Sequence, residues 1–231
     1  MNNTYVKSMI VRSILASIGA LVLSFNVYAA GNRHYTIMPT GDSITQGSKP
    51  CVSYSYPLWK MLTAAGYDFE YIGPRTHTYD VGTLKHCGFG GKTAEYLAAN
   101  IDSLYRMYPA DVVLLHAGHN HFVERQPIPE IIDAHRSIID QVLSINPDAK
   151  IFVAQVIPSG KLPKYSYIPD LNVELKKMVR SYHSKNVVAV NVAKGFNWET
   201  DTQQDHVHPN AQGAEKMARK WMKSIRHHLK P

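Results

Sequence analysis

A serine, a histidine and an aspartate stand near the two ends of the sequence in surroundings that favour nucleophilic catalysis. Ser43 lies in Gly41–Thr45, directly after an apolar run, and His208 follows Asp205 by three residues. An aspartate at that offset can hold the imidazole in the tautomer that accepts a serine proton, and it can stabilise the imidazolium that forms. The sequence therefore predicts Ser43 as nucleophile, His208 as general base and Asp205 as the orienting acid.

Each of these motifs alone has an ordinary structural explanation. A Gly-Asp-Ser tripeptide is usually a turn, and a histidine three residues after an aspartate near a helix start is often part of a cap. His206 is a second candidate base, but only His208 has the aspartate at the three-residue offset and a following proline. The two motifs together, at the two ends of one α/β pattern, favour the catalytic interpretation.

Two further segments offer hydrogen-bond donors for the negative charge that develops on an attacked carbonyl oxygen. The stretch Gly88–Thr93 has little side-chain bulk, so the backbone N–H of Gly91 can approach that oxygen; an ordinary flexible loop is the alternative. Asn120 follows the most apolar predicted strand and would bring a side-chain amide to the same cleft. Preorganised donors of this kind usually supply a large part of the rate enhancement.

Residues beside these motifs are candidates for substrate contacts. Asp42 precedes the serine, His121 follows the asparagine, and Tyr165 lies in a polar loop after a predicted strand, where a plain surface tyrosine is the alternative. His116, His119 and His121 alternate near the predicted cleft, but no carboxylate or thiol stands at a matching ligand spacing. No metal site is therefore predicted.

The elements that must position these residues follow an alternating pattern. From residue 34 onward, apolar runs alternate with segments of helical period, which is typical of a parallel sheet covered by helices. In open α/β sheets, ligands bind beyond the carboxyl ends of the strands, where Ser43 and Asn120 both stand. The predicted strands are five: His34–Pro39, Tyr67–Ile72, Asp111–His116, Lys150–Ile157 and Asn186–Val192.

Helices are expected between these strands. The clearest lies between Pro129 and Ile145, where apolar residues recur at steps of three and four on one side. Another predicted helix has Pro57 in its first turn and runs to Ala65, and the others are Thr93–Met107, about Asp170–His183, and a last helix from Pro209 or Asn210 to about Leu229.

Length and composition indicate one exported domain. The 231 residues, 45% of them hydrophobic, suffice for a single α/β domain. Lys7 and Arg12 precede an apolar run, residues 13–25, that is too short to span a bilayer. We expect residues 1–29 to be a signal peptide, cleaved after Ala29 or, as the next candidate, Ala30, and residues 30–231 to be the domain. Export to the periplasm or beyond, without stable membrane insertion, follows; an uncleaved anchor is the alternative.

The net charge indicates which partners to expect, and the cysteine content indicates the redox state of the thiols. Removing Lys7 and Arg12 lowers the formal net charge from +7 to +5, and the basic residues are scattered or lie on helix faces. That distribution is typical of a solvated surface, so no nucleic-acid partner is predicted. Cys51 and Cys87 are expected to form a disulfide in an oxidising compartment, with two buried free thiols as the alternative. Such a bridge would tie the Ser43 loop to the Gly91 loop.

Ser43, Gly91, Asn120 and His208 occur in the order of the four blocks of the SGNH (GDSL-like) hydrolase superfamily, and the sequence resembles that superfamily over about residues 35–228. The resemblance implies a flavodoxin-like three-layer α/β/α sandwich with a five-stranded parallel sheet and a Ser-His-Asp catalytic set. It implies an oxyanion hole built from the Ser43 and Gly91 backbone N–H groups and the Asn120 side chain. It implies no metal and no organic cofactor.

Within the superfamily, residues 41–47, 54–59 and 71–73 are similar to the acetylxylan-esterase branch of carbohydrate esterases, which removes acetyl groups from polysaccharides. His121 stands where the family usually has an aspartate, which separates this chain from its relatives in the loop contacts near Asn120. The predicted function is a serine esterase that hydrolyses short-chain esters on O-acetylated carbohydrate, acting on a small-molecule or polysaccharide ester. The alternatives are a lysophospholipase or thioesterase for longer acyl chains and a non-catalytic glycan-binding module.

Overall fold

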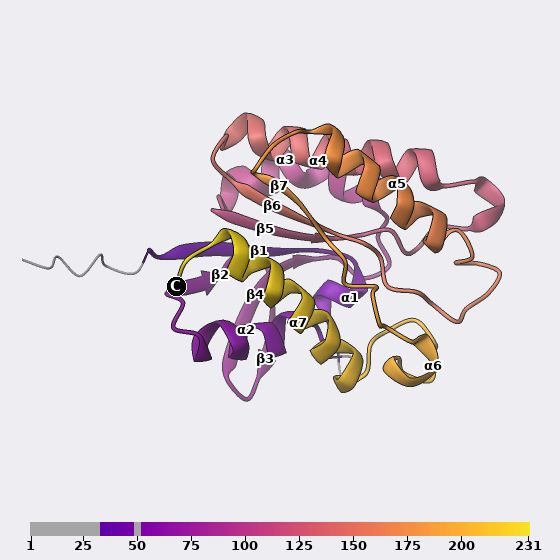
Figure 1. Cartoon of the computed structure of the whole chain (residues 1–231), viewed down its shortest axis with the longest axis horizontal. Coiled ribbons are helices and arrows are strands. Elements are labelled where there is room, and N and C mark those ends of the chain that lie inside the picture. Colours follow the sequence, from indigo (N-terminus) through magenta and orange to yellow (C-terminus); the bar gives the residue numbers. More distant parts are fainter. Residues whose placement is uncertain (1–32, 49–51) are drawn as a thin grey trace, which may run out of the picture. The chain divides into compact units, whose positions relative to one another are not determined.

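A mostly parallel β-sheet lies between two layers of helices in the computed structural model, which describes residues 33–48 and 52–231 (Figure 1). The strands of the sheet, in chain order, are β1 (Tyr35–Gly41), β2 (Phe69–Tyr71), β3 (Arg75–Tyr79), β4 (Gly82–Gly88), β5 (Val112–His116), β6 (Lys150–Ala154) and β7 (Val187–Val190). The expected α/β class is thereby confirmed.

Five of these strands are the predicted ones, and they pair in the parallel order β2-β1-β5-β6-β7. This is the flavodoxin-like order, in which ligands bind where the strand order reverses beside the first strand. The register places Gly41, the last residue of β1, opposite His116, the last residue of β5. The Ser43 turn and the Asn120 loop therefore leave the sheet side by side.

The predicted count of five strands is wrong, because β3 and β4 extend the sheet to seven. They form an antiparallel hairpin, and β4 also runs parallel to the end of β1, with Gly88 opposite Gly41. All five residues of β3 are exposed or only partly buried, so the strand has no apolar run from which it could be predicted. The hairpin brings the chain that carries Gly91 to the end of β1.

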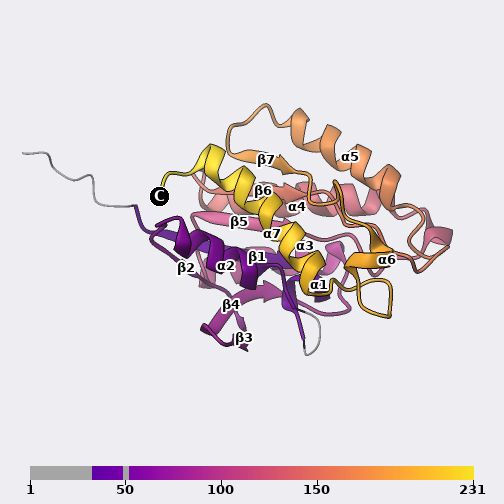
Figure 2. The same cartoon turned by 60° about the horizontal axis from the view of Figure 1, so that its bottom comes forward.

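Helices cover both faces of the sheet (Figures 1 and 2). On one face lie α3 (Ala94–Met107), α4 (Ile128–Ile145) and α5 (Ile168–Ser181), and on the other lie α2 (Ser55–Ala64) and α7 (Ala211–His228). Each predicted helix is present, with its ends within two residues of the expected positions. Three short helices follow no strong periodicity: α1 (Ser43–Gln46), α6 (Trp198–Asp201) and the 3-10 helix η1 (Val123–Arg125).

Two apolar cores hold the layers together, one on each face of the sheet. Alternate side chains of a strand point to opposite faces, so Val113 and Leu115 of β5 enter the core beneath α3, α4 and α5. Val112 and Leu114 enter the core beneath α2 and α7. All five residues of β5 are buried, as expected for a parallel strand covered on both faces.

Some sequence predictions fall on residues that the structure does not describe. The predicted signal peptide, residues 1–29, and Cys51 lie outside the described residues, so the signal peptide, the domain boundary and the disulfide stay predictions. Cys87 is described as a free, fully buried cysteine on β4. Among the helices of the described residues, none has the length and apolar character needed to cross a membrane.

Candidate active site

Ser43 is held in a tight turn at the carboxyl edge of the sheet. A Cβ on Gly41 would stand 2.1 Å from the carbonyl oxygen of His116, so only glycine allows β1 to lie this close to the end of β5. Asp42 caps the short helix α1 by accepting a hydrogen bond from the backbone N–H of Ile44 at 2.9 Å. Ser43, the first residue of α1, is therefore fixed in direction and remains partly exposed.

A hydrogen-bonded series connects Ser43 to Asp205 through His208. Nε2 of His208 lies 2.8 Å from Oγ of Ser43, and Nδ1 of the same ring lies 2.5 Å from Oδ2 of Asp205. An imidazole that donates Nδ1–H to a carboxylate presents an unprotonated Nε2, which is the tautomer that accepts a serine proton. The structure thus brings together the three residues predicted to form the catalytic set.

Asp205 is positioned by its own loop. Its Oδ1 accepts the backbone N–H groups of Val207 at 2.9 Å and His208 at 3.0 Å. Partial burial acts to raise the pKa of Asp205, but the hydrogen bond from the His208 ring and those from the two N–H groups outweigh it and lower the pKa. Asp205 therefore stays ionised at neutral pH.

An ion pair between a buried aspartate and a partly exposed lysine anchors residues 202–210, the segment that carries Asp205 and His208 and that we call the His208 loop. Asp201 is fully buried, and its two carboxylate oxygens lie 2.8 and 2.7 Å from Nζ of Lys216 on α7. The backbone N–H of Asn210 donates to the Asp201 carbonyl at 2.9 Å and closes the loop at its other end. Sequence reasoning missed this anchor, because no local pattern links Asp201 to Lys216.

The glycine-rich segment is tied to the Ser43 turn by two hydrogen bonds. The backbone N–H of Phe89 donates to the Gly41 carbonyl at 2.9 Å, and the N–H of Gly90 donates to Oε1 of Gln46 at 2.7 Å. Gly91 follows with a φ of 73°, a conformation that favours glycine. Gln46 was not predicted as a site residue, although it belongs to the segment 41–47 that resembles the acetylxylan-esterase branch.

Asn120 lies against the same segment. Its side-chain Nδ2 donates to the Lys92 carbonyl at 3.0 Å, next to Gly91, and its backbone has a φ of 69°. One N–H of the amide is used in this bond, which leaves the second for a ligand. Ser43, Gly91 and Asn120, the predicted oxyanion donors, therefore meet at one corner of the sheet.

The sequence of residues 40–216 matches the model of the GDSL-like lipase/acylhydrolase family. The chain belongs to this family. Its members' common chemistry makes it a carboxylic ester hydrolase.

Similar proteins place this GDSL-like acylhydrolase near carbohydrate esterases. A family 3 carbohydrate esterase of Clostridium thermocellum is 26% identical, with a TM-score of 0.73 over 86% of this chain and 100% of that one. A family 3 carbohydrate esterase of Talaromyces cellulolyticus has the same fold, with 22% identity and a TM-score of 0.73 over 83% of this chain and 96% of that one. A multidomain esterase of Ruminococcus flavefaciens is 26% identical over 84% of this chain; the match spans only 29% of that protein's length.

His121 of this acylhydrolase braces a loop, and it lines a hollow together with Asn120, so its predicted contact with a substrate stays a prediction. Its Nε2 lies 2.9 and 3.0 Å from the two carboxylate oxygens of Glu95 on α3, and its Nδ1 lies 2.9 Å from the carbonyl oxygen of His119. The side chain is 7% exposed. The histidine that replaces the usual aspartate thus fixes the segment that presents Asn120.

Asp42 and Tyr165, also predicted as substrate contacts, are buried behind Ser43. Tyr165 is 5% exposed, so the surface-tyrosine alternative is wrong, and its ring packs edge-on against His119 at 5.2 Å. Nδ1 of His119 lies 3.9 Å from Oδ2 of Asp42, and neither atom has a hydrogen-bond partner among the described residues. Burial raises the pKa of Asp42 to about 6, although the N–H of Ile44 opposes the shift. These side chains support the Ser43 turn from within.

The remaining histidines take no part in the series around Ser43. The ring of His206, the alternative base, packs edge-on against Trp198 at 5.3 Å. His116 is fully buried, and burial together with the nearby His135 lowers its pKa to about 3. In the parts of the chain that the structure describes, no group of three or more potential metal ligands comes together.

Proposed function

We propose that the chain is a serine esterase that removes acetyl groups from O-acetylated carbohydrate through an acyl-enzyme on Ser43. The observation that carries the proposal is the continuous series Ser43 Oγ, His208 and Asp205, with separations of 2.8 and 2.5 Å. A serine hydroxyl is activated for attack on an ester carbonyl when it is hydrogen-bonded to a neutral imidazole that a carboxylate holds in position.

Acylation follows from this geometry. His208 Nε2 takes the proton of the Ser43 hydroxyl while Oγ bonds to the acetyl carbon, and the carbonyl oxygen becomes an oxyanion. The N–H groups of Ser43 and Gly91 and the Asn120 amide stabilise that charge. The tetrahedral intermediate collapses, the bond to the sugar oxygen breaks, and His208 returns the proton to that oxygen.

Deacylation reverses the roles with water as the nucleophile. His208 Nε2 accepts a proton from water as its oxygen bonds to the acetyl carbon of acetyl-Ser43. The second tetrahedral intermediate expels Ser43 Oγ, which recovers its proton from His208, and acetate leaves. Asp205 remains ionised throughout and stabilises the imidazolium in both steps.

Support for carbohydrate as the alcohol part of the ester comes from two sources. The 26% identical relative from Clostridium thermocellum is a family 3 carbohydrate esterase, and it is matched over its whole length. Residues 41–47, 54–59 and 71–73 are similar to the acetylxylan-esterase branch, which favours the acetyl group.

Acetate release by Ser43→Ala tests the serine mechanism. Turnover of p-nitrophenyl acetate should fall to background in this variant, whereas Ser103→Ala, which alters an exposed serine on α3, should match the wild type. Labelling with a fluorophosphonate probe should likewise require Ser43. Near-wild-type turnover by Ser43→Ala would refute the proposal, and absence of labelling in an active-site-intact protein would favour a non-catalytic glycan-binding module.

A series of p-nitrophenyl esters tests the acyl preference. We expect kcat/KM to be highest for acetate and to fall steeply for longer chains. A maximum at long acyl chains would replace the acetyl proposal with a lysophospholipase or thioesterase activity of the same site. Acetate release from acetylated xylan and other acetylated glycans would then identify the alcohol part.

Export and the disulfide remain part of the proposal. Residues 1–29 have the charge and apolar pattern of a signal peptide, and Cys51 and Cys87 would bond after export. Amino-terminal sequencing of the mature protein should begin at residue 30 or 31. Mass spectrometry of non-reduced peptides should find Cys51 linked to Cys87; two free thiols would contradict the bridge.

A further inference from the structure

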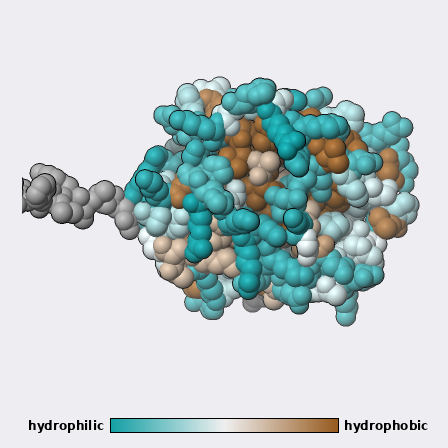
Figure 3. Space-filling model, viewed as in Figure 1, coloured by the Kyte–Doolittle hydropathy of each residue, from teal (hydrophilic) through white to brown (hydrophobic). Residues whose placement is uncertain are grey.

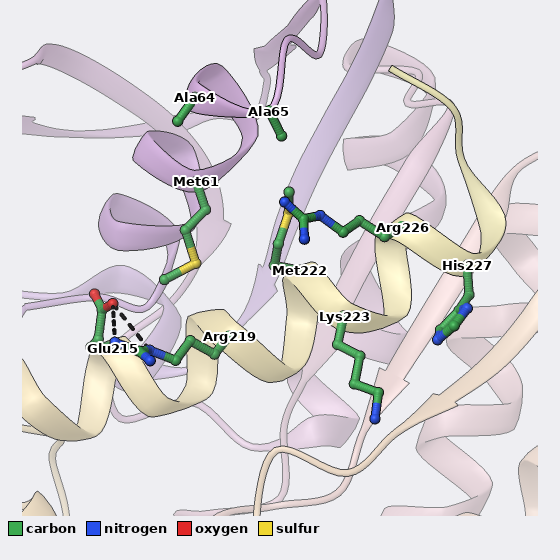
Figure 4. Close-up of a pocket in the computed structure, with 9 residues that line it drawn as sticks. All are labelled: Met61, Ala64, Ala65, Glu215, Arg219, Met222, Lys223, Arg226 and His227. Carbon is green, nitrogen blue, oxygen red and sulfur yellow. Dashed lines mark hydrogen bonds and ion pairs between the residues drawn. The ribbon is translucent and has the colours of Figure 1, made fainter.

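A trough runs between α2 and α7 on the face of the sheet opposite α3, α4 and α5. It consists of two adjoining hollows of about 570 and 440 Å³, which share Met61, Ala64 and Glu215 as lining residues. We call it the α2–α7 trough; Figure 4 shows its larger part. A third hollow of about 390 Å³ shares Lys223 and His227 with it but lies between α7 and β7, and none of its lining residues comes from α2.

The floor of the trough is apolar. Met61, Ala64 and Ala65 line it from α2, and Met222 lines it from α7. In Figure 4 the two methionine side chains project from facing helices into the space between them. Methionine side chains adapt to the shape of what they contact, so this floor suits the apolar faces of a ligand of variable structure.

The wall of the trough that α7 forms is cationic. Arg219, Lys223, Arg226 and His227 line the larger hollow from α7, and all four are exposed. Figure 3 shows hydrophilic side chains over this face of the molecule, with hydrophobic patches between them. Among the described residues that line the two hollows of the trough, Glu215 is the one acidic residue. Its Oε1 lies 3.3 Å from the Arg219 guanidinium.

Two of these cations are left uncompensated by the protein. Lys223 and Arg226 form no ion pair with any described residue, whereas Lys60, in the smaller hollow, lies 3.4 Å from Asp80. Arg219, Lys223 and Arg226 follow one another at helical steps of four and three, at which like charges repel. A ligand that carries negative charges would relieve this repulsion, so the charge complementarity points to an anion.

The trough begins beside the proposed active site. Ala211, which lines the smaller hollow, stands three residues after His208, so their Cα atoms are at most about 11 Å apart. From there α7 carries the trough along its length to His227. A concave, elongated, open trough fits a polymer chain, whereas a membrane surface is contacted by protruding side chains.

We propose that the α2–α7 trough binds a carboxylate-bearing polysaccharide, so that the polymer presented to Ser43 is an O-acetylated acidic glycan. That the polymer is O-acetylated rests on the proposed esterase function, whereas binding of the polymer to the trough does not depend on it. Sugar rings would lie on the apolar floor, and their carboxylates would face Lys223 and Arg226. Such contacts between exposed charges weaken as salt is added.

Binding is tested without catalysis, on the Ser43→Ala protein with polygalacturonate as the probe. We expect saturable binding at low ionic strength that weakens as salt is added. The double variant Lys223→Glu/Arg226→Glu should bind roughly tenfold or more weakly, because it replaces two attractions with two repulsions. Lys176→Glu/Arg180→Glu makes the same charge change on exposed residues of α5, on the opposite face, and should bind like the parent.

Activity then connects the trough to the substrate. With acetylated polygalacturonate, Lys223→Glu/Arg226→Glu should raise KM by roughly tenfold and leave kcat unchanged. The same variant should turn over p-nitrophenyl acetate and neutral acetylated xylan at the wild-type rate. The α5 control should turn over all three substrates at the wild-type rate. A wild-type protein inactive on every ester would defeat the esterase proposal while the binding experiment still reported on the trough.

Three outcomes would overturn the inference. Polygalacturonate binding that is equal in the two double variants would show that the trough is not the binding surface. If Lys223→Glu/Arg226→Glu lost as much activity on neutral acetylated xylan as on the acidic polymer, contacts with carboxylates would not explain the loss. Binding through Lys223 and Arg226 to anionic lipid vesicles, but not to polygalacturonate, would assign the cations to a membrane surface.

Discussion

Asp205 contacts the imidazole of His208 and not the Ser43 hydroxyl. In the proposed mechanism, the role of Asp205 is therefore to fix which ring nitrogen of His208 carries the proton and to stabilise the imidazolium. The carboxylate suits this task because its second oxygen is occupied by the N–H groups of Val207 and His208. The chemical contribution of Asp205 can be separated from its structural one by a substitution that keeps the shape.

Asp205→Asn should lower kcat by about 10,000-fold, because an amide N–H facing Nδ1 would leave Nε2 protonated and unable to accept the serine proton. The asparagine carbonyl can still accept the two loop N–H groups, so the unfolding midpoint should change little. Steady-state kinetics on p-nitrophenyl acetate and thermal unfolding measure the two effects.

Asp68→Asn is the matched control, since Asp68 forms another His-Asp pair, with Nδ1 of His34 2.8 Å from its Oδ1, at the other end of β1. This variant should keep wild-type kcat. Equal losses in both variants would show that the effect of Asp205→Asn is not specific to His208.

Asp42 should make the protein less stable as pH rises. Burial raises its pKa from 3.8 to about 6 in the folded chain, so between these values the unfolded chain loses the proton first. The free energy of unfolding should therefore fall over this window by about 3 kcal/mol from this group alone. Asp42→Asn removes the titration and keeps an oxygen for the Ile44 N–H.

Denaturant unfolding of the wild type and Asp42→Asn at about pH 4 and pH 7 measures this contribution. Relative to the wild type, the free energy of unfolding of Asp42→Asn should rise by about 3 kcal/mol as the pH is raised. A difference that does not change with pH would contradict an ionisable carboxyl buried behind Ser43.

At the scale of elements, the His208 loop depends on α7. Asp201 stands at the end of α6, immediately before the loop, and α7 begins immediately after it, so the bond from Lys216 to Asp201 closes the loop at its base. The Asp201 carboxylate is fully buried, whereas the Lys216 side chain is 37% exposed. The pair thus fixes the element that carries two members of the catalytic set.

Lys216→Met should lower the free energy of unfolding by about 2–3 kcal/mol, because it leaves the Asp201 carboxylate buried without a cation. The value is below that of a fully buried pair, since water screens Lys216 in part. We also expect kcat/KM for p-nitrophenyl acetate to fall, because the His208 ring loses its fixed position. Chemical denaturation and steady-state kinetics measure both.

Lys220→Met, on the next turn of α7, removes a lysine that pairs with no described acid and should leave both quantities unchanged. Adding Asp201→Asn to Lys216→Met should restore part of the lost stability, because the uncompensated charge is gone. No recovery in the double variant would mean that packing, and not charge, explains the loss.

At the scale of the whole molecule, α7 serves the sheet and the site together. Trp221 of α7 is fully buried and stacks on Tyr54 with ring centroids 5.5 Å apart, in the core between the sheet and the α2–α7 layer. The same helix begins immediately after the His208 loop and forms one wall of the α2–α7 trough. The position of this layer therefore determines both the proposed active site and the proposed polymer surface.

Trp221→Ala should lower the free energy of unfolding by about 3–5 kcal/mol, since it leaves a cavity in a core that cannot fully close. Trp221→Phe should cost less, because the ring is retained. Thermal unfolding measures the effect, and Phe122→Ala, at a side chain that is 51% exposed, should shift the midpoint little. A small shift for Trp221→Ala would contradict the packing of α7 on the sheet.

The helices and the five parallel strands could be predicted because their signals are local. Apolar residues at steps of three and four mark α4, and the run of buried residues in β5 marks a strand covered on both faces. The hairpin of β3 and β4 carried no such signal. Its mostly polar strands are held by pairing with each other and with the end of β1, which a local pattern does not contain.

The sequence by itself determined which residues form the candidate site. The aspartate three residues before His208, the Gly-Asp-Ser turn, the glycine-rich stretch and Asn120 after a strand are short patterns whose meaning depends on neighbouring residues. These patterns also indicated the family to which the chain belongs.

Only the tertiary structure decided how these residues meet. Ser43 and His208 are 165 residues apart, and their 2.8 Å contact exists because the sheet order and the docking of α7 bring both ends of the chain to one edge. Long-range packing likewise buried Tyr165, joined Lys216 to Asp201 and opened the trough between α2 and α7. Side-chain contacts between distant elements depend on the packing of the whole core, which no local pattern encodes.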